Sequence, residues 1–549
     1  MALMAAHRFA GIVLLTVVCA IGSGIAQAPA PKQRHSGIRA YIASAWDTLT
    51  RRMDRCSAII DPKLPAGQSR LYLPAGMAIP ERVAALGRQC RVRIENLPAP
   101  IKGPSEVDTS SIRPGLLYLP NPYVVPGGRF NEMYGWDSYF IILGLLEDGR
   151  VDLARGMVEN FFFELEHYGA VLNANRTYYL TRSQPPFLTS MILAVWEADK
   201  QTRSDRAWLE RAYAAANKDY QFWTTGAHLA GKTGLSRYYD FGSGPVPEET
   251  PTYGQVARWL MGRLNTEFFE PTSASDASRS TPAWSVQLCS ATAGKDARKA
   301  CQNVTTVALK VDYYKGDRSM RESGFDISFR FGPFGARTHH FAPVCLNSLL
   351  YKTEMDMQRI ASELGLNADA QTWAKRAETR KQGMQQLFWD AQRGQFFDWN
   401  HVTNSRSTYE FASTFYPLWT GWATPEQAAA VARSTSAFIQ PGGLATSRTT
   451  SGVQWDFPYG WAPLQLIAVE GLRRYGQGQQ AKQIVDAWLS MVRENYEREG
   501  TIREKYNVVT RSPETRLTAG YEQNVVGFGW TNGVVLRLLK LEGGTQTPK

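Results

Sequence analysis

The amino-acid sequence predicts an all-α protein, and three observations lead to this prediction. Apolar residues recur at the spacings that place them on one face of a helix, most clearly between Leu346 and Leu364. Alternating, strand-like patterns are scarce, and residues 396–399 form at most one arm of a short hairpin. The 549 residues are 44% hydrophobic and 12% aromatic, which excludes a disordered chain.

Amphipathic helices are expected along most of the chain. Because helices over such a length must bury their apolar faces against one another, we expect a toroid or solenoid of helices. No motif repeats at a fixed period, which disfavours a simple solenoid array. The stretches with a helical period are 151–168, 186–201, 206–224, 346–364, 370–389, 426–439, 461–475, 484–492 and 528–542.

Three segments depart from the helical pattern. Residues 1–28 combine a basic start, an apolar run and small residues at 26–28, which is typical of a secretory signal peptide cleaved near Ala28. Residues 29–125 are broken by Pro and Gly and should form a loop-rich segment that wraps over a helical domain of residues 126–545. The Ser/Thr/Ala-rich stretch 271–306 should be a surface insertion.

The signal peptide predicts a periplasmic or secreted protein. No later stretch reaches the roughly 20 apolar residues that span a bilayer, so no membrane association is expected after cleavage. The net charge is +11, but the basic residues are scattered singly, which argues against nucleic-acid binding. No heptad seam or interface stripe is visible, and we expect a monomer.

Export would place the cysteines in an oxidising compartment. Two local disulfides, Cys56–Cys90 and Cys289–Cys301, are then the simplest arrangement, and Cys345 in an apolar helical stretch would be a buried free thiol. The cysteine spacings do not suit zinc, and the adjacent pair His339–His340 is not a chelating arrangement. We therefore expect no metal ion.

Two loop segments combine aromatic rings, carboxylates and amides beside Gly and Pro. They read PGGRFNEMYGWDSY at residues 126–139 and QWDFPYGWAP at residues 454–463. Aromatic faces stack on the C–H side of a pyranose, while Asp, Asn, Gln and Arg bind its hydroxyls. Taken singly, each Trp is more often core and each Asp a helix cap, but several such clusters together favour a sugar site.

The first segment resembles the first signature of the trehalases, and the second resembles their second signature. Trehalases, glycoside hydrolase family 37, are inverting enzymes that split α,α-trehalose into two glucoses. Stretches 173–186, 321–326 and 504–508 are similar to the family's, as is 527–533, in order over about residues 115 to 540. The resemblance implies an (α/α)₆ barrel, trehalose as substrate and no cofactor.

The resemblance also implies roles for individual residues. Asp326 would be the general acid that protonates the glycosidic oxygen, and Glu522 the base that activates water, with Glu504 as the competing base. Inversion requires two carboxyl groups about 6.5–9.5 Å apart, so that a water molecule fits between them. The residues that the resemblance assigns to substrate binding are Arg129, Phe130, Trp136, Asp137, Asn173, Arg182, Ser183, Gln184, Glu248, Gly324 and Trp455.

Four departures from the family pattern leave alternatives open. Tyr521 occupies the base position unless one residue is deleted, in which case Glu522 reaches it. Val246 stands where the family has an Arg, Cys345 replaces an Asp, and the stretch 248–326 is longer than usual. Two further hypotheses therefore compete with a trehalase: an inverting α-glycosidase for another α-glucoside, and a non-catalytic sugar-binding homologue that has lost the base.

Overall fold

The structure, a computed structural model, describes residues 37–249, 252–263, 265–272, 283–287, 304–521 and 523–543. All of them belong to the unit Ser36–Lys549. The predicted signal peptide, the Cys289–Cys301 pair and most of the predicted insertion lie outside the described residues.

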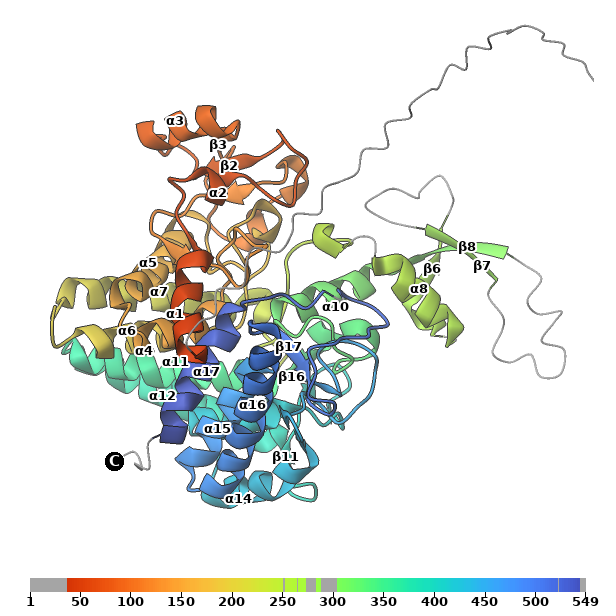
Figure 1. The fold of residues 1–549 in the computed structure, drawn as a ribbon. Coiled ribbons are helices and arrows are strands. Elements are labelled where there is room, and N and C mark those ends of the chain that lie inside the picture. Colours follow the sequence, from red (N-terminus) through yellow and green to blue (C-terminus); the bar gives the residue numbers. More distant parts are fainter. Residues whose placement is uncertain are drawn as a thin grey trace, which may run out of the picture. The chain divides into compact units, whose positions relative to one another are not determined.

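Among the described residues, six helices follow one another in a closed ring. Each packs against the next, and the last of them, α17, packs along the first, α4 (Figure 1). The ring consists of α4 (Asp137–Glu147), α6 (Leu188–Asp199), α11 (Val344–Glu363), α13 (Tyr416–Thr420), α15 (Ala462–Arg474) and α17 (Gly529–Gly543).

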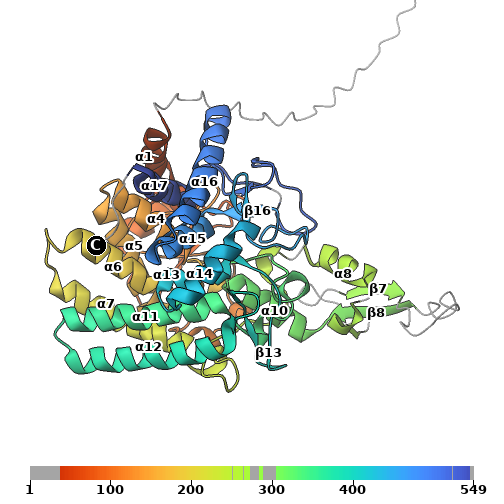
Figure 2. The ribbon, with the colours of Figure 1, turned by 90° about the horizontal axis from the view of Figure 1, so that it is seen from below.

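A second set of six helices covers the outside of this ring. For example, α12 runs beside α11 (Figure 2), and α16 packs against both α15 and α17. The outer helices are α1 (Ile38–Leu49), α5 (Val151–His167), α7 (Arg206–Trp223), α12 (Asn367–Phe388), α14 (Pro425–Ser434) and α16 (Gly478–Glu499). Six inner and six outer helices in this part of the chain make the predicted (α/α)₆ barrel, which is confirmed.

The inner helix α4 and the outer helix α12 differ in how their apolar residues are distributed, because α4 is surrounded by other helices and α12 has one face in solvent. The inner helix α4 buries most of its residues on all sides, whereas the longer outer helix α12 buries a single apolar face. Where α4 meets α17, two glycines allow the backbones to touch. A Cβ added at Gly533 would lie 2.0 Å from the carbonyl oxygen of Phe140, and one at Gly144 would lie 2.5 Å from the Cα of Gly533. Any larger residue there would push the two helices apart.

Four further helices of the described residues belong to neither set: α2 (Cys56–Ile59), α3 (Glu81–Cys90), α8 (Thr252–Gly262) and α10 (Val311–Glu322). None of the described helices is both long and apolar enough to cross a membrane. The predicted disulfide Cys56–Cys90 joins α2 to the end of α3, with 5.4 Å between the Cα atoms. Cys345, near the start of α11, is a buried free thiol as predicted.

The strands are short and form small sheets at the margins of the helical ring. In the N-terminal region β2 (Arg70–Leu73) pairs in parallel with β3 (Arg93–Asn96) and β4 (Leu116–Leu117), a sheet that the sequence analysis did not predict. The remaining strands pair antiparallel: β1 (Thr50–Arg51) with β5 (Tyr123–Val124), β6 (Phe269–Pro271) and β7 (Ala283–Gln287) with β8 (Val304–Leu309), β9 (Phe341–Ala342) and β13 (Ser405–Arg406) with β12 (Trp399–Asn400), β10 (Trp389–Asp390) with β11 (Gln395–Phe396), β14 (Ile439–Gln440) with β15 (Gly443–Leu444), and β16 (Tyr459–Trp461) with β17 (Lys505–Asn507).

One buried carboxyl on an outer helix should make stability depend on pH. Asp219 in α7 is 3% exposed, and burial raises its pKa to about 7. A group whose pKa is raised on folding stabilises the folded state at low pH, and this contribution is lost as the pH rises through the folded pKa. Stability should therefore fall between about pH 4 and pH 7. At pH 8 the Asp219→Asn variant, which cannot ionise, should be more stable than the parent by up to about 4 kcal/mol.

Urea unfolding at pH 5 and pH 8 measures this effect. The control is Asp486→Asn on the outer helix α16, where the side chain is 50% exposed beside Lys482 and should change stability little at either pH. A difference between Asp219→Asn and the parent that stays the same at both pH values would contradict the prediction.

Candidate active site

A cavity of about 700 Å³ opens at the N-terminal ends of three inner helices, α4, α15 and α17. Trp136 precedes the first turn of α4, Trp461 precedes α15, and Trp530 lies in the first turn of α17, and all three line the cavity. Helix N-termini carry a partial positive charge, which favours carboxylates and hydroxyl oxygens there. The volume is within the range of small-ligand sites and is sufficient for a disaccharide.

Most of the residues that the resemblance assigned to the site line this cavity. They are Arg129, Phe130, Trp136, Asp137, Asn173, Arg182, Gln184, Glu248, Gly324, Asp326 and Trp455.

Two of the assigned residues are not among them. The hydroxyl of Ser183 donates to the carbonyl oxygen of Val171 at 2.5 Å, and its amide donates to the carboxylate of Glu322 at 3.2 Å, so Ser183 anchors the backbone beside Arg182. Glu522 lies outside the described residues.

Glu504, the competing base, lies in the cavity wall with both carboxylate oxygens in contact with polar partners. The hydroxyl of Tyr521 donates to Oε1 at 2.6 Å, and the ammonium group of Lys505 lies 3.3 Å from Oε2. Burial and the carboxylates of Glu504 and Asp326 raise the pKa of Tyr521 well above its ordinary value. The phenol therefore keeps its proton and is the donor in this bond.

Asp326 is held in place by the second signature segment. The side-chain amide of Gln454 donates to the carbonyl oxygen of Asp326 at 2.5 Å, and the amide of Trp455 donates to that of Ile327 at 3.1 Å. The amide of Phe329 donates to the carboxylate of Asp456 at 2.9 Å. Three consecutive residues thus fix the backbone that carries Asp326, whose side chain is 37% exposed and lies 4.0 Å from the guanidinium of Arg321.

A third carboxyl, that of Asp137, occupies the first position of α4. Burial raises its pKa well above the ordinary value, and the charges of Glu504 and Asp326 raise it further. These effects favour a proton on Asp137, and a protonated carboxyl can donate a hydrogen bond.

Four indoles pack together along the cavity wall. Trp455 and Trp461 stack with centroids 4.0 Å apart and planes 5° from parallel. Trp136 lies 5.8 Å from Trp455, and Trp530 lies 5.7 Å from Trp461. Each indole is almost fully buried by its neighbours, so the cluster supplies a rigid apolar surface for a pyranose ring.

Opposing charges line another part of the cavity. The guanidinium of Arg182 bonds to Glu248 Oε1 at 2.5 Å and lies 3.5 Å from Asp240. Burial acts to raise the pKa of Glu248, but Arg182 and Arg321 outweigh it and hold this pKa below its ordinary value. Arg129 lies over the ring of Tyr521, 5.2 Å from its centroid.

The N-terminal region contributes to the wall through an ion-pair cluster. The cavity-lining Arg176 pairs with Asp61 and, at 2.7 Å, with Glu132, and Lys63 also pairs with Glu132 at 2.8 Å. Arg176 belongs to the stretch 173–186 that resembles the family. No sequence signal pointed to Lys63, which comes from a distant part of the chain.

Comparison with known proteins decides the family. A family model described as Trehalase matches residues 104–543, which is most of the sequence. The chain belongs to the trehalase family. A cytosolic neutral trehalase of Beauveria bassiana is 36% identical over 555 residues, covering 89% of this chain and 71% of the relative.

A comparison with a trehalase sequence and a comparison with a solved trehalase structure, both from Saccharomyces cerevisiae, agree with this assignment. A cytosolic neutral trehalase from that yeast is 35% identical over 558 residues, covering 90% of this chain and 70% of the relative. The solved structure of the neutral trehalase Nth1 from the same organism superposes with a TM-score of 0.72 at 31% identity, covering 92% of this chain and 93% of the other.

The relatives correct one prediction. A signal peptide and a periplasmic or secreted location were expected, but the trehalases of Beauveria bassiana and Saccharomyces cerevisiae are named cytosolic. Their names point to the cytosol, and the prediction of export is wrong on this finding. The signal-peptide prediction depended on the apolar run of residues 10–21, and a run of this length is also typical of a buried helix.

The position where the trehalase family has an Arg lies away from the cavity wall. Val246 is fully buried in an apolar cluster with Tyr253 and Ile327. The cavity nevertheless contains a guanidinium beside Asp326, because Arg321 reaches it from the last turn of α10.

Proposed function

We propose that the protein hydrolyses α,α-trehalose to two glucose molecules with inversion, using Asp326 as the general acid and Glu504 as the general base. Membership of the trehalase family supports the substrate and the overall reaction. The observation that carries the residue assignment is the presence of Asp326 and Glu504 in the wall of one cavity of disaccharide size, beside four packed indoles.

Asp326 is assigned as the acid because its carboxyl is the more open of the two. Its side chain is 37% exposed, against 3% for Glu504, and it can reach the oxygen between two sugar rings. As the bond from the anomeric carbon to this oxygen breaks, the carboxyl proton passes to the oxygen, and one ring leaves as glucose with its hydroxyl in the α configuration.

Glu504 is assigned as the base because its partners hold the carboxylate in a fixed orientation in the cavity wall. Tyr521 and Lys505 each contact one oxygen, and a carboxylate has further lone pairs with which to bind a water molecule. That water gives a proton to Glu504 and adds to the anomeric carbon from the face opposite the leaving group, which produces β-glucose. Exchange with solvent then returns Asp326 to its protonated and Glu504 to its ionised form.

The remaining side chains of the cavity are assigned to binding. The Arg182–Glu248 pair presents both a donor and an acceptor to vicinal hydroxyls, while the indole surface excludes water from the ring that reacts. We also propose that residues 29–125 form a segment that wraps over the helical domain of residues 126–545 and supplies the outer helix α1 to it, and that the enzyme is a monomer.

The test is the hydrolysis of trehalose followed by ¹H NMR. The full chain is mixed with trehalose, and the anomeric protons are recorded before mutarotation. Equal initial amounts of α- and β-glucose are expected. Formation of α-glucose alone would exclude inversion. Faster turnover of maltose or kojibiose than of trehalose would favour another α-glucosidase, and binding without turnover of any of the three sugars would favour a non-catalytic sugar-binding protein.

A further inference from the structure

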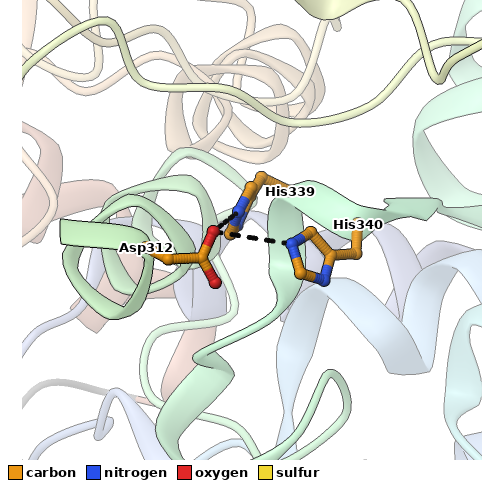
Figure 3. A group of neighbouring side chains, drawn as sticks. All are labelled: Asp312, His339 and His340. Carbon is orange, nitrogen blue, oxygen red and sulfur yellow. Dashed lines mark hydrogen bonds and ion pairs between the residues drawn. The ribbon is translucent and has the colours of Figure 1, made fainter. Parts of the chain in front are cut away.

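A cluster of possible metal ligands lies outside the cavity, at Asp312, His339 and His340. Asp312 is in the first turn of α10, and the two histidines end the short 3₁₀ helix Thr338–His340, 27 residues further along the chain. Figure 3 shows both imidazole rings turned toward the Asp312 carboxylate. No other group of three His, Cys, Asp or Glu side chains converges in this way in the part of the chain that the structure describes.

The distances within this cluster suit a small metal ion. Asp312 Oδ1 lies 2.9 Å from His339 Nε2 and 3.6 Å from His340 Nε2, and the three ligand atoms all lie within 4.8 Å of one another. A tetrahedral ion with bonds of about 2.0–2.2 Å separates its ligand atoms by roughly 3.3–3.5 Å. Small side-chain rotations would bring the three atoms to that spacing.

The 3₁₀ turn explains how two adjacent histidines can point the same way. In a strand, consecutive side chains would face opposite sides. Here the rings lie 4.2 Å apart at 59° to each other, on one side of the chain. The sequence analysis dismissed this pair because adjacency alone does not predict such a turn, nor a carboxylate supplied by α10.

The exposure of the ligands also favours binding. His339 is buried, whereas Asp312 is 60% exposed, so an ion can enter from solvent. Two guanidinium groups lie nearby and each has a partner: Arg337 pairs with Glu267, and Arg237 bonds to the carbonyl oxygen of His339.

We propose that Asp312, His339 and His340 form a binding site for a divalent transition-metal ion such as Zn²⁺, with water in the open position. Two imidazoles and one carboxylate favour zinc, nickel or copper over calcium or magnesium, which prefer sites built from oxygen ligands. The metal site is independent of the hydrolytic reaction.

Such an ion would join two segments that flank the loop carrying Asp326. α10 already packs tightly here, since a Cβ added at Gly316 would lie 1.9 Å from the carbonyl oxygen of Ala336. An ion bound to Asp312 and the two histidines would close this 27-residue span with a second link. Binding to the folded state alone raises the thermal midpoint, and we expect a rise of about 2 °C at saturation.

The experiment is calorimetric titration of the full chain, prepared without a histidine tag, with ZnCl₂ at pH 7.5. We expect saturable binding of one Zn²⁺ per chain. When Co²⁺ replaces Zn²⁺ as the probe, we expect the bound Co²⁺ to absorb visible light as it does in a coordination site of low symmetry. His340→Ala and Asp312→Asn change exposed or half-buried side chains and should weaken Zn²⁺ binding at least about 10-fold. His167→Ala is the matched control, because His167 lies beside Glu166 on α5 without a third ligand.

Each outcome decides for or against the metal site. One-to-one binding that both variants weaken, and the control does not, supports it. The absence of one-to-one binding overturns it, as does binding that His340→Ala and Asp312→Asn leave unchanged. Equal binding of Ca²⁺ or Mg²⁺ would overturn the assigned class of metal. Trehalose turnover shows whether the His340→Ala, Asp312→Asn and His167→Ala variants are folded, because none of these three substituted residues is required for the reaction.

Discussion

Replacing Glu504 by Gln should lower kcat for trehalose by about 10²–10⁴-fold and change KM little. The amide retains the shape of the carboxylate and can still accept the bond from Tyr521, but it cannot take a proton from water. Steady-state glucose release measures the effect. Since the change leaves the buried Lys505 without its counter-charge, thermal unfolding and trehalose binding should be measured on the same sample.

Glu522→Gln is the matched control, because Glu522 is the residue that the family resemblance first assigned as the base. We expect it to retain activity within about 10-fold of the parent, as a residue that does not transfer the proton would. If instead Glu522→Gln is inactive and Glu504→Gln remains active, the base is Glu522 and the assignment of Glu504 is wrong.

Chemical rescue gives an independent test of the same role. In Glu504→Ala, azide can occupy the space of the missing carboxylate and the water. With α-glucosyl fluoride as substrate it should attack the anomeric carbon directly and form β-glucosyl azide, since this nucleophile needs no base. The β configuration of that product would place Glu504 on the face from which water attacks.

The barrel was predictable because most of its helices are amphipathic, among them the inner helix α11, which matches the predicted stretch 346–364. The predicted stretches 151–168 and 206–224 correspond to α5 (Val151–His167) and α7 (Arg206–Trp223), where apolar residues repeat on one face. The inner helix α4 was not predicted, since a helix that is apolar on all sides has no such period. The parallel sheet around β2 was missed because strands of two to four residues leave no alternating pattern.

The composition of the site was predictable to the extent that its residues fall in long motifs. Trp136, Asp137 and Asp326 were assigned in this way, and all three line the cavity. The choice between Glu504 and Glu522 was not predictable, because Glu522 reaches the family's base position only if one residue is deleted from the alignment, which otherwise places Tyr521 there. Our proposal of Glu504 depends on its contacts with Tyr521 and Lys505, and a sequence does not show contacts of this kind.

The second signature segment shows a further limit of reading roles from residue types. Gln454, Trp455 and Asp456 have the composition of a sugar-binding loop, but each of them also holds the backbone of residues 326–329 by a hydrogen bond. Their polar atoms are therefore partly committed to positioning the acid. The composition of the segment predicted that it lies in the site, but it did not predict that the segment also positions the backbone that carries Asp326.

Replacing Asp326 by Asn should lower kcat for trehalose by about 10²–10⁴-fold, with a loss that depends on the leaving group. Trehalose requires a proton on the departing oxygen, whereas fluoride departs as an anion without one. Asp326→Asn should therefore retain much of the parent's activity on α-glucosyl fluoride while losing its activity on trehalose. Initial rates on the two substrates, expressed as a ratio to the parent, measure this selectivity.

The same pair of substrates separates the acid from the base. Glu504→Gln should be slow on both, because water must be activated whichever group leaves, so only Asp326→Asn should discriminate between the two substrates. An Asp326→Asn enzyme that is equally slow on trehalose and on α-glucosyl fluoride would mean that Asp326 does not act as the proton donor. Because the side-chain amide of Gln454 donates to the backbone oxygen of Asp326, the substitution leaves this anchor of the loop in place.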